Sequence, residues 1–79
     1  MHPSIIVRAD WDAEAKVWVA RSDDIGGLSV EAETHEALER KVLDAVADLI
    51  ELNGFDNGLP DVPVHIMSSQ VTRIPNPGA

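Results

Sequence analysis

A single amphipathic helix, predicted over residues 34–52, limits the folds that this chain can adopt. Thr34 can cap the free N–H groups of the first turn, and Glu36 favours the positive end of the helix dipole. Gly54 suits the left-handed position that ends a helix. Apolar residues recur between these signals at helical spacing, with one lysine at the edge of the stripe: Ala37, Leu38, Lys41, Val42, Ala45, Val46, Leu49 and Ile50. A helix of roughly 27 Å, at 1.5 Å per residue, is long enough to cross a four-stranded sheet.

Four short stretches show the alternation of apolar and polar residues that is typical of β-strands. They are residues 4–11, 16–21, 28–33 and 62–67. Short connections join the first three strands into an antiparallel meander, and the helix then returns the chain so that the fourth strand lies parallel to the first. The sequence therefore predicts a single α+β domain, β-β-β-α-β, with sheet order 3-2-1-4. We expect this domain to span residues 1–71, with 72–79 as a flexible C-terminal tail.

One helix covers only one face of such a sheet, and we expect the open face to support self-association into a homo-oligomer. Alternation along the first strand places Ile6 and Arg8 on the open face. In the second strand, four consecutive apolar residues leave two alternatives. The helix-facing pair is either Val17 and Val19 or Trp18 and Ala20. In the first alternative Trp18 joins Ile6 and Arg8, and these three are the candidate self-association residues.

The charge of the chain separates classes of partner. Fourteen Asp and Glu against six Lys and Arg give a net charge of −8. Such a surface repels phosphate backbones and attracts a basic protein, so we expect no direct nucleic-acid binding. On the predicted helix, Asp44, Asp48 and Glu51 place like charges three and four residues apart near the negative end of the dipole. Acidity that only keeps the protein soluble is the alternative explanation.

The sequence contains no motif for a cofactor, a metal site or nucleophilic catalysis. Cysteine is absent, the three histidines are isolated, and Ser68 and Ser69 have no visible base partner. No apolar run is long enough to span a membrane, and no signal peptide is visible, so we expect a cytoplasmic protein. The predicted element order is also the first part of a ribonuclease-H-like fold. A minimal metal-dependent nuclease is therefore an alternative, with Asp10 joined by Glu36, Glu39 or Asp61.

Three segments resemble the N-terminal domain of HicB-type antitoxins, and are still more similar to the short, stand-alone HicB-like bacterial family. They are Val-Trp-Val-Ala at 17–20, Ser-Asp-Asp-Ile-Gly-Gly at 22–27 and Glu-Thr-His-Glu-Ala-Leu at 33–38. The resemblance covers about residues 4–70, and differs where Ile25 stands in place of the usual loop proline. It implies a partial ribonuclease-H-like fold without the nuclease active site. It also implies binding to a small basic toxin that cleaves mRNA, by contacts that mask the toxin's catalytic surface.

Charge and resemblance together predict a non-catalytic protein-binding module of the antitoxin type, with no cofactor and no metal. The expected partner is a small, basic, toxin-like protein. The candidate contacts are the acidic residues of the predicted loop and helix: Asp23, Asp24, Asp44, Asp48 and Glu51. The alternatives are the nuclease with Asp10 and a structural homo-oligomer without a toxin partner.

Overall fold

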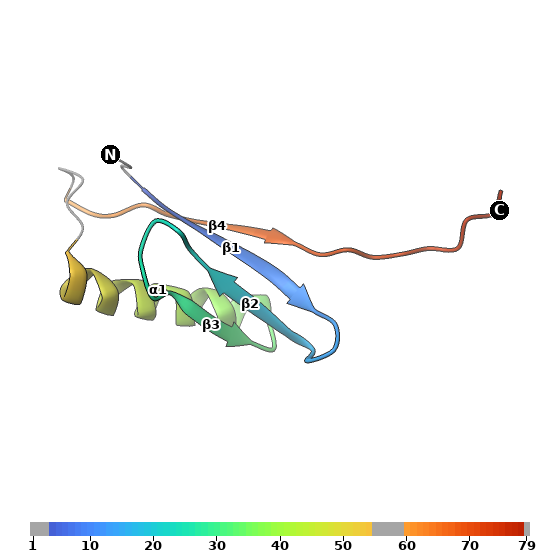
Figure 1. Cartoon of the computed structure of the whole chain (residues 1–79), viewed down its shortest axis with the longest axis horizontal. Coiled ribbons are helices and arrows are strands. Elements are labelled where there is room, and N and C mark those ends of the chain that lie inside the picture. The colour runs from blue at the N-terminus through green and yellow to red at the C-terminus, as the bar shows by residue number, and fades with distance from the viewer. Residues whose placement is uncertain (1–3, 55–59, 79) are drawn as a thin grey trace.

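The computed structural model describes residues 4–54 and 60–78, and it has the predicted α+β architecture. The elements are β1 (Ile5–Asp12), β2 (Val17–Arg21), β3 (Ser29–Ala32), α1 (His35–Asn53) and β4 (Val64–Ser69). The sheet order is β3-β2-β1-β4. β2 pairs antiparallel with both β1 and β3, while β4 pairs parallel with β1. Figure 1 shows α1 lying across one face of this sheet, so the predicted topology is confirmed.

The core lies between α1 and the face of the sheet that α1 covers. Ile5, Val7 and Ala9 of β1 are fully buried and the residues between them are exposed, whereas Trp11 further along the strand is half-buried. The buried apolar side chains are Ile5, Val7, Ala9, Ala20, Ile25, Leu28, Ala32, Leu38, Val42 and Val46. The predicted stripe on the helix is therefore confirmed, and Lys41 lies at its edge, where Nζ donates to the backbone oxygen of Glu31 at 2.8 Å.

The helix begins and ends as its sequence signals predict. The Thr34 hydroxyl accepts a hydrogen bond from the Ala37 backbone N–H at 3.1 Å. At the other end, the Gly54 N–H donates to the Ile50 oxygen at 2.8 Å, and Gly54 adopts a φ of 78° that disfavours any residue with a Cβ. The helix reaches Asn53, one residue beyond the predicted end.

The register of the first hairpin decides which face Trp18 occupies. Trp18 lies opposite Trp11, and Ala20 lies opposite the buried Ala9. Directly opposite residues share a face of the sheet, so Trp18 and Ala20 face the helix. The prediction that Trp18 joins Ile6 and Arg8 in a self-association surface on the open face is therefore wrong.

The end of the chain differs most from prediction. β4 runs two residues later than predicted, because Ser68 and Ser69 continue the edge strand and pair with β1. The predicted connection after the helix lies partly outside the described residues, at 55–59. Beyond β4, residues 70–78 are exposed and extend away from the body of the fold (Figure 1). Flexibility of residues 72–79 stays a prediction.

Candidate functional site

Three of the predicted partner contacts form an acidic row on α1, which consists of Asp44, Asp48 and Glu51. All three are exposed, and they lie on the side of α1 opposite its buried stripe. The last turn of the helix contains no basic residue. Within residues 4–54 and 60–78, no hydrogen bond or ion pair is recorded for these carboxylates. Leu52, which is 81% exposed and lies one turn after Asp48, places apolar surface beside the row.

The loop after β2 gives its two aspartates different roles. The Ile6 N–H donates to Asp24 Oδ2 at 2.8 Å, and the Ser22 hydroxyl donates to the Ile6 oxygen at 2.7 Å. Asp24 and Ser22 are also joined directly, because the Asp24 N–H donates to Ser22 Oγ at 3.1 Å. Asp24 and Ser22 therefore provide hydrogen-bond partners for the N–H and C=O groups of Ile6. Ile6 needs them because the pairing of β1 with β2 ends at Arg8 and Arg21. Asp24 is thus held within the fold, whereas Asp23 is exposed.

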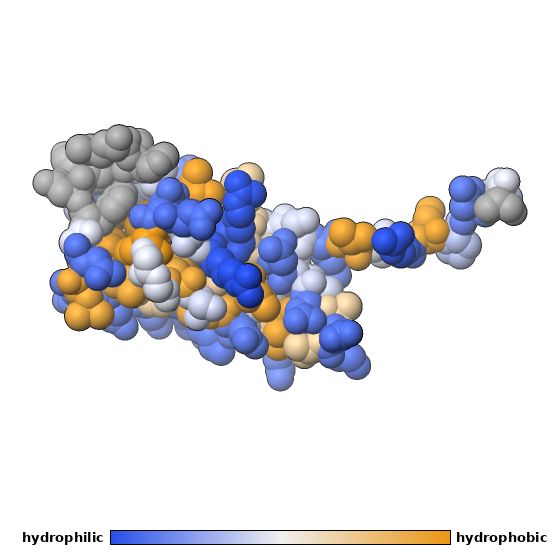
Figure 2. Space-filling model, viewed as in Figure 1, coloured by the Kyte–Doolittle hydropathy of each residue, from blue (hydrophilic) through white to orange (hydrophobic). Residues whose placement is uncertain are grey.

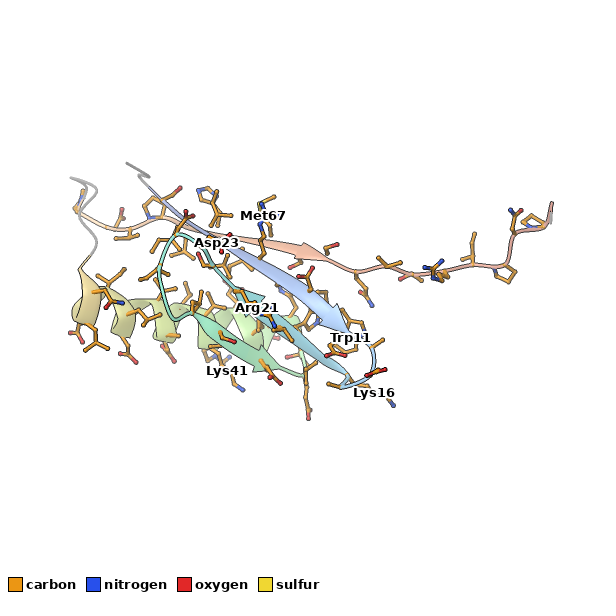
Figure 3. The ribbon with its side chains drawn as sticks, viewed as in Figure 1. Trp11, Lys16, Arg21, Asp23, Lys41 and Met67 are labelled. Carbon is orange, nitrogen blue, oxygen red and sulfur yellow. The ribbon has the colours of Figure 1, made fainter. Side chains whose placement is uncertain are left out.

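The open face of the sheet brings charges of both signs together. Ile6, Arg8 and Asp10 line a concavity of about 330 Å³ with the neighbouring Arg21 and the loop residues 22–24. Figure 3 labels Arg21 on β2 and Asp23 in the loop that follows. Figure 2 shows hydrophilic groups across the middle of this face, with apolar groups beside them. The predicted self-association residues Ile6 and Arg8 therefore do lie together, but among charged side chains.

The five predicted contacts divide between two surfaces. Asp23 and Asp24 line the concavity of the open face, while the acidic row lies on the outer side of α1, across the sheet. The loop nevertheless approaches the helix, because a Cβ at Gly27 would lie 3.5 Å from Leu49 Cδ2. Asp56, which is near the row in sequence, lies outside the described residues.

One contact was missed by sequence reasoning, which found no base partner for Ser68. The imidazole of His35, at the start of α1, is hydrogen-bonded through Nε2 to Ser68 Oγ on β4. The His35 ring also meets Trp18 edge-on, with centroids 5.3 Å apart. This hydrogen bond joins the start of α1 to the edge strand β4. Because 33 positions separate the two residues, no local pattern indicates it.

Asp10 and the helix carboxylates Glu36 and Glu39, which were offered for the nuclease alternative, are not brought together. Asp10 is exposed on the open face of β1, whereas Glu36 and Glu39 belong to α1 on the opposite face. Among the described residues, no group of three or more His, Cys, Asp or Glu side chains could hold a metal ion. Residues 4–54 and 60–78 also contain no helix that is both long and apolar enough to cross a membrane.

Comparisons with known proteins identify the family. A family model described as a domain of unknown function, DUF1902, matches residues 4–75, and the chain belongs to this family. The crystal structure of a hypothetical protein from the extremely thermophilic bacterium Thermus thermophilus is similar, with 40% sequence identity and a TM-score of 0.67. That match covers 92% of this chain and 99% of the other. A search of curated proteins found no match.

Proposed function

We propose that this member of the DUF1902 family is a non-catalytic protein-binding module that acts as a HicB-like antitoxin. In this proposal it binds a small, basic, mRNA-cleaving toxin in the cytoplasm and masks the toxin's catalytic surface. The observation that carries the proposal is the acidic row, Asp44, Asp48 and Glu51, exposed on α1 without a basic residue in the last turn. The resemblance of residues 17–20, 22–27 and 33–38 to HicB-type antitoxins supports it.

The like charges of the acidic row destabilise the free helix. A basic partner would remove this unfavourable electrostatic energy. Like charges at these spacings each cost a few tenths of a kcal/mol, and carboxylates near the C-terminus of a helix oppose its dipole by a similar amount. A complementary basic surface removes both penalties and accelerates encounter. Leu52 beside the row supplies apolar area that such a contact would bury.

The test combines binding with inhibition of the ribonuclease. The partner in the assay is a small basic ribonuclease of the toxin type, purified from the organism that produces this chain. Its mRNA cleavage is measured with and without a stoichiometric amount of this chain. A variant with Asp44→Lys, Asp48→Lys and Glu51→Lys should bind roughly tenfold more weakly, or worse, mainly through a slower association rate. It should also inhibit cleavage correspondingly less.

The matched control reverses three exposed acids elsewhere, with Glu14→Lys, Glu31→Lys and Glu33→Lys. It changes the net charge by the same amount but leaves the acidic row intact. Equal loss of affinity in both variants would show that binding depends on net charge and not on the row. If the unmodified chain failed to inhibit mRNA cleavage by the ribonuclease, the antitoxin proposal would be refuted. The structural homo-oligomer would then remain as the alternative.

A further inference from the structure

The edge of the sheet formed by β4 continues into a segment that pairs with no other strand among residues 4–54 and 60–78. Residues 70–75, called the C-terminal arm here, extend the line of β4 away from the fold (Figure 1). Val71 and Ile74 on this arm are 79% and 84% exposed. Among the described residues beyond β4, the recorded hydrogen bond is local, from the Gly78 N–H to Asn76 Oδ1. β-Branched residues in an extended, exposed segment favour pairing with another strand.

The positions of the prolines leave the free edge able to pair. The Ile5 N–H donates to the Pro63 oxygen at 2.9 Å, and Ile5 lies opposite Val64. In this parallel ladder the odd-numbered residues of β4 bond to β1, so the even-numbered residues turn their N–H and C=O groups to the free edge. Pro63, Pro75 and Pro77 are all odd-numbered. If the arm keeps the alternation of β4, every free-edge position from 64 to 76 retains its hydrogen-bond donor.

The same stretch is free of negative charge. All 14 acidic residues of the chain lie between Asp10 and Asp61. Residues 62–79 contain none, while His65 and Arg73 lie within them. Two copies of a chain with a net charge of −8 would therefore meet with least repulsion along this edge.

We propose that the occupant of this edge is a second copy of the chain, paired antiparallel about a two-fold axis at Ser69. In this register Met67, which is 56% exposed, lies opposite Val71 of the second copy on the open face. Val64, which is half-buried, lies opposite Ile74 on the helix face. Each pair occurs twice by symmetry, and Pro63 opposite Pro75 bounds the paired segment at both ends. The two sheets become one continuous sheet of eight strands.

Two further features favour this edge over the open face as the contact between copies. α1 packs mainly against β3 and β2, so the helix-facing side chains Val64 and Ile66 remain only half-buried and gain cover from the second copy. The open face, in contrast, would bury Arg8 and Asp10 together with their neighbours. Edge pairing leaves the acidic row of each copy accessible, so it is compatible with partner binding on α1.

Cysteine cross-linking tests the register directly, because the chain contains no cysteine. Ser69→Cys places two sulfurs opposite each other at a non-hydrogen-bonded pair, where the Cα atoms are about 4.5 Å apart and a disulfide forms readily. Gln70→Cys is the matched control, because its counterpart lies diagonally across the pair at about 7–8 Å. Under mild oxidation, non-reducing electrophoresis should show mostly covalent dimer for Ser69→Cys and little for Gln70→Cys. Equal cross-linking of the two, or none, overturns the register.

A pair of proline variants tests the edge hydrogen bonds without touching the core. Thr72→Pro removes a donor turned to the second copy, whereas Arg73→Pro removes one turned away from it. Sedimentation should show the dimer weakened by about tenfold to a hundredfold for Thr72→Pro, because two symmetry-related bonds are lost, and by less than about threefold for Arg73→Pro. Circular dichroism should show both variants folded. A native chain that stays monomeric at its highest soluble concentration, or equal weakening by both variants, refutes the proposal.

Discussion

Replacing Asp24 and Asp23 in turn distinguishes a carboxylate that stabilises the fold from one that is exposed and available to a partner. The Asp24 side chain accepts the Ile6 N–H at 2.8 Å, whereas the adjacent Asp23 is exposed. We expect Asp24→Ala to lower the free energy of unfolding and Asp23→Ala to leave it nearly unchanged. The two substitutions remove the same charge from neighbouring positions of one loop, so Asp23→Ala is the matched control.

The magnitude follows from the hydrogen bond that is lost. A hydrogen bond to a charged group contributes about 1.5–3 kcal/mol, and water can partly replace it here because Ile6 is 38% exposed. The expected loss for Asp24→Ala is therefore about 1.5–2 kcal/mol, which corresponds to a fall in Tm of about 10 °C for a domain of this size. Asp23→Ala should change the free energy of unfolding by less than about 0.5 kcal/mol. Asp24→Asn, which keeps an oxygen acceptor, should fall between the two.

Urea unfolding followed by tryptophan fluorescence provides the assay. Trp11 and Trp18 contact each other with ring centroids 5.5 Å apart, and their emission should change when the hairpin opens. With an m-value near 1 kcal/mol per molar, the Asp24→Ala midpoint should shift by about 1.5–2 M. All variants are compared at one protein concentration, because association adds to apparent stability. Equal midpoints for Asp24→Ala and Asp23→Ala would refute the structural role of Asp24.

Two further predictions concern the helix and use the same urea titration. Leu38→Ala should cost about 2–5 kcal/mol, because the side chain is fully buried and its removal leaves a cavity; a loss below about 1 kcal/mol would contradict this packing. Thr34→Ala should cost about 1 kcal/mol, because the Ala37 N–H loses its acceptor, while Thr34→Ser should restore most of that loss. A Thr34→Ser variant as unstable as Thr34→Ala would show that the cap is not responsible.

The helix was the most predictable element because its signals are local. Thr34 and Ala37 are three residues apart, and Gly54 bonds to Ile50 within the same turn. The sheet order was predictable for a related reason. Short connections leave neighbouring strands few arrangements, and a helix that crosses the sheet returns the chain beside the first strand.

The faces and contacts of the candidate site were less predictable. Four consecutive apolar residues give β2 no alternation, so only its pairing with β1 shows that Trp18 faces the helix. The role of Asp24 depends on Ile6, 18 residues away, although a Ser-Asp-Asp sequence directly after a strand is typical of side chains that bond to backbone. The exposed positions of the acidic row, in contrast, followed from helical periodicity alone.

Local spacing and composition are enough to predict the elements, their order, the buried stripe of α1 and the concentration of negative charge before residue 62. Only the folded chain shows which side of the sheet Trp18 occupies, which backbone group Asp24 binds, that His35 contacts Ser68, and which residues of β4 turn their backbone groups to the free edge. These features depend on strand register and on residues far apart in the chain. Register is a property of two strands together, and a shift of one residue exchanges the faces of every side chain.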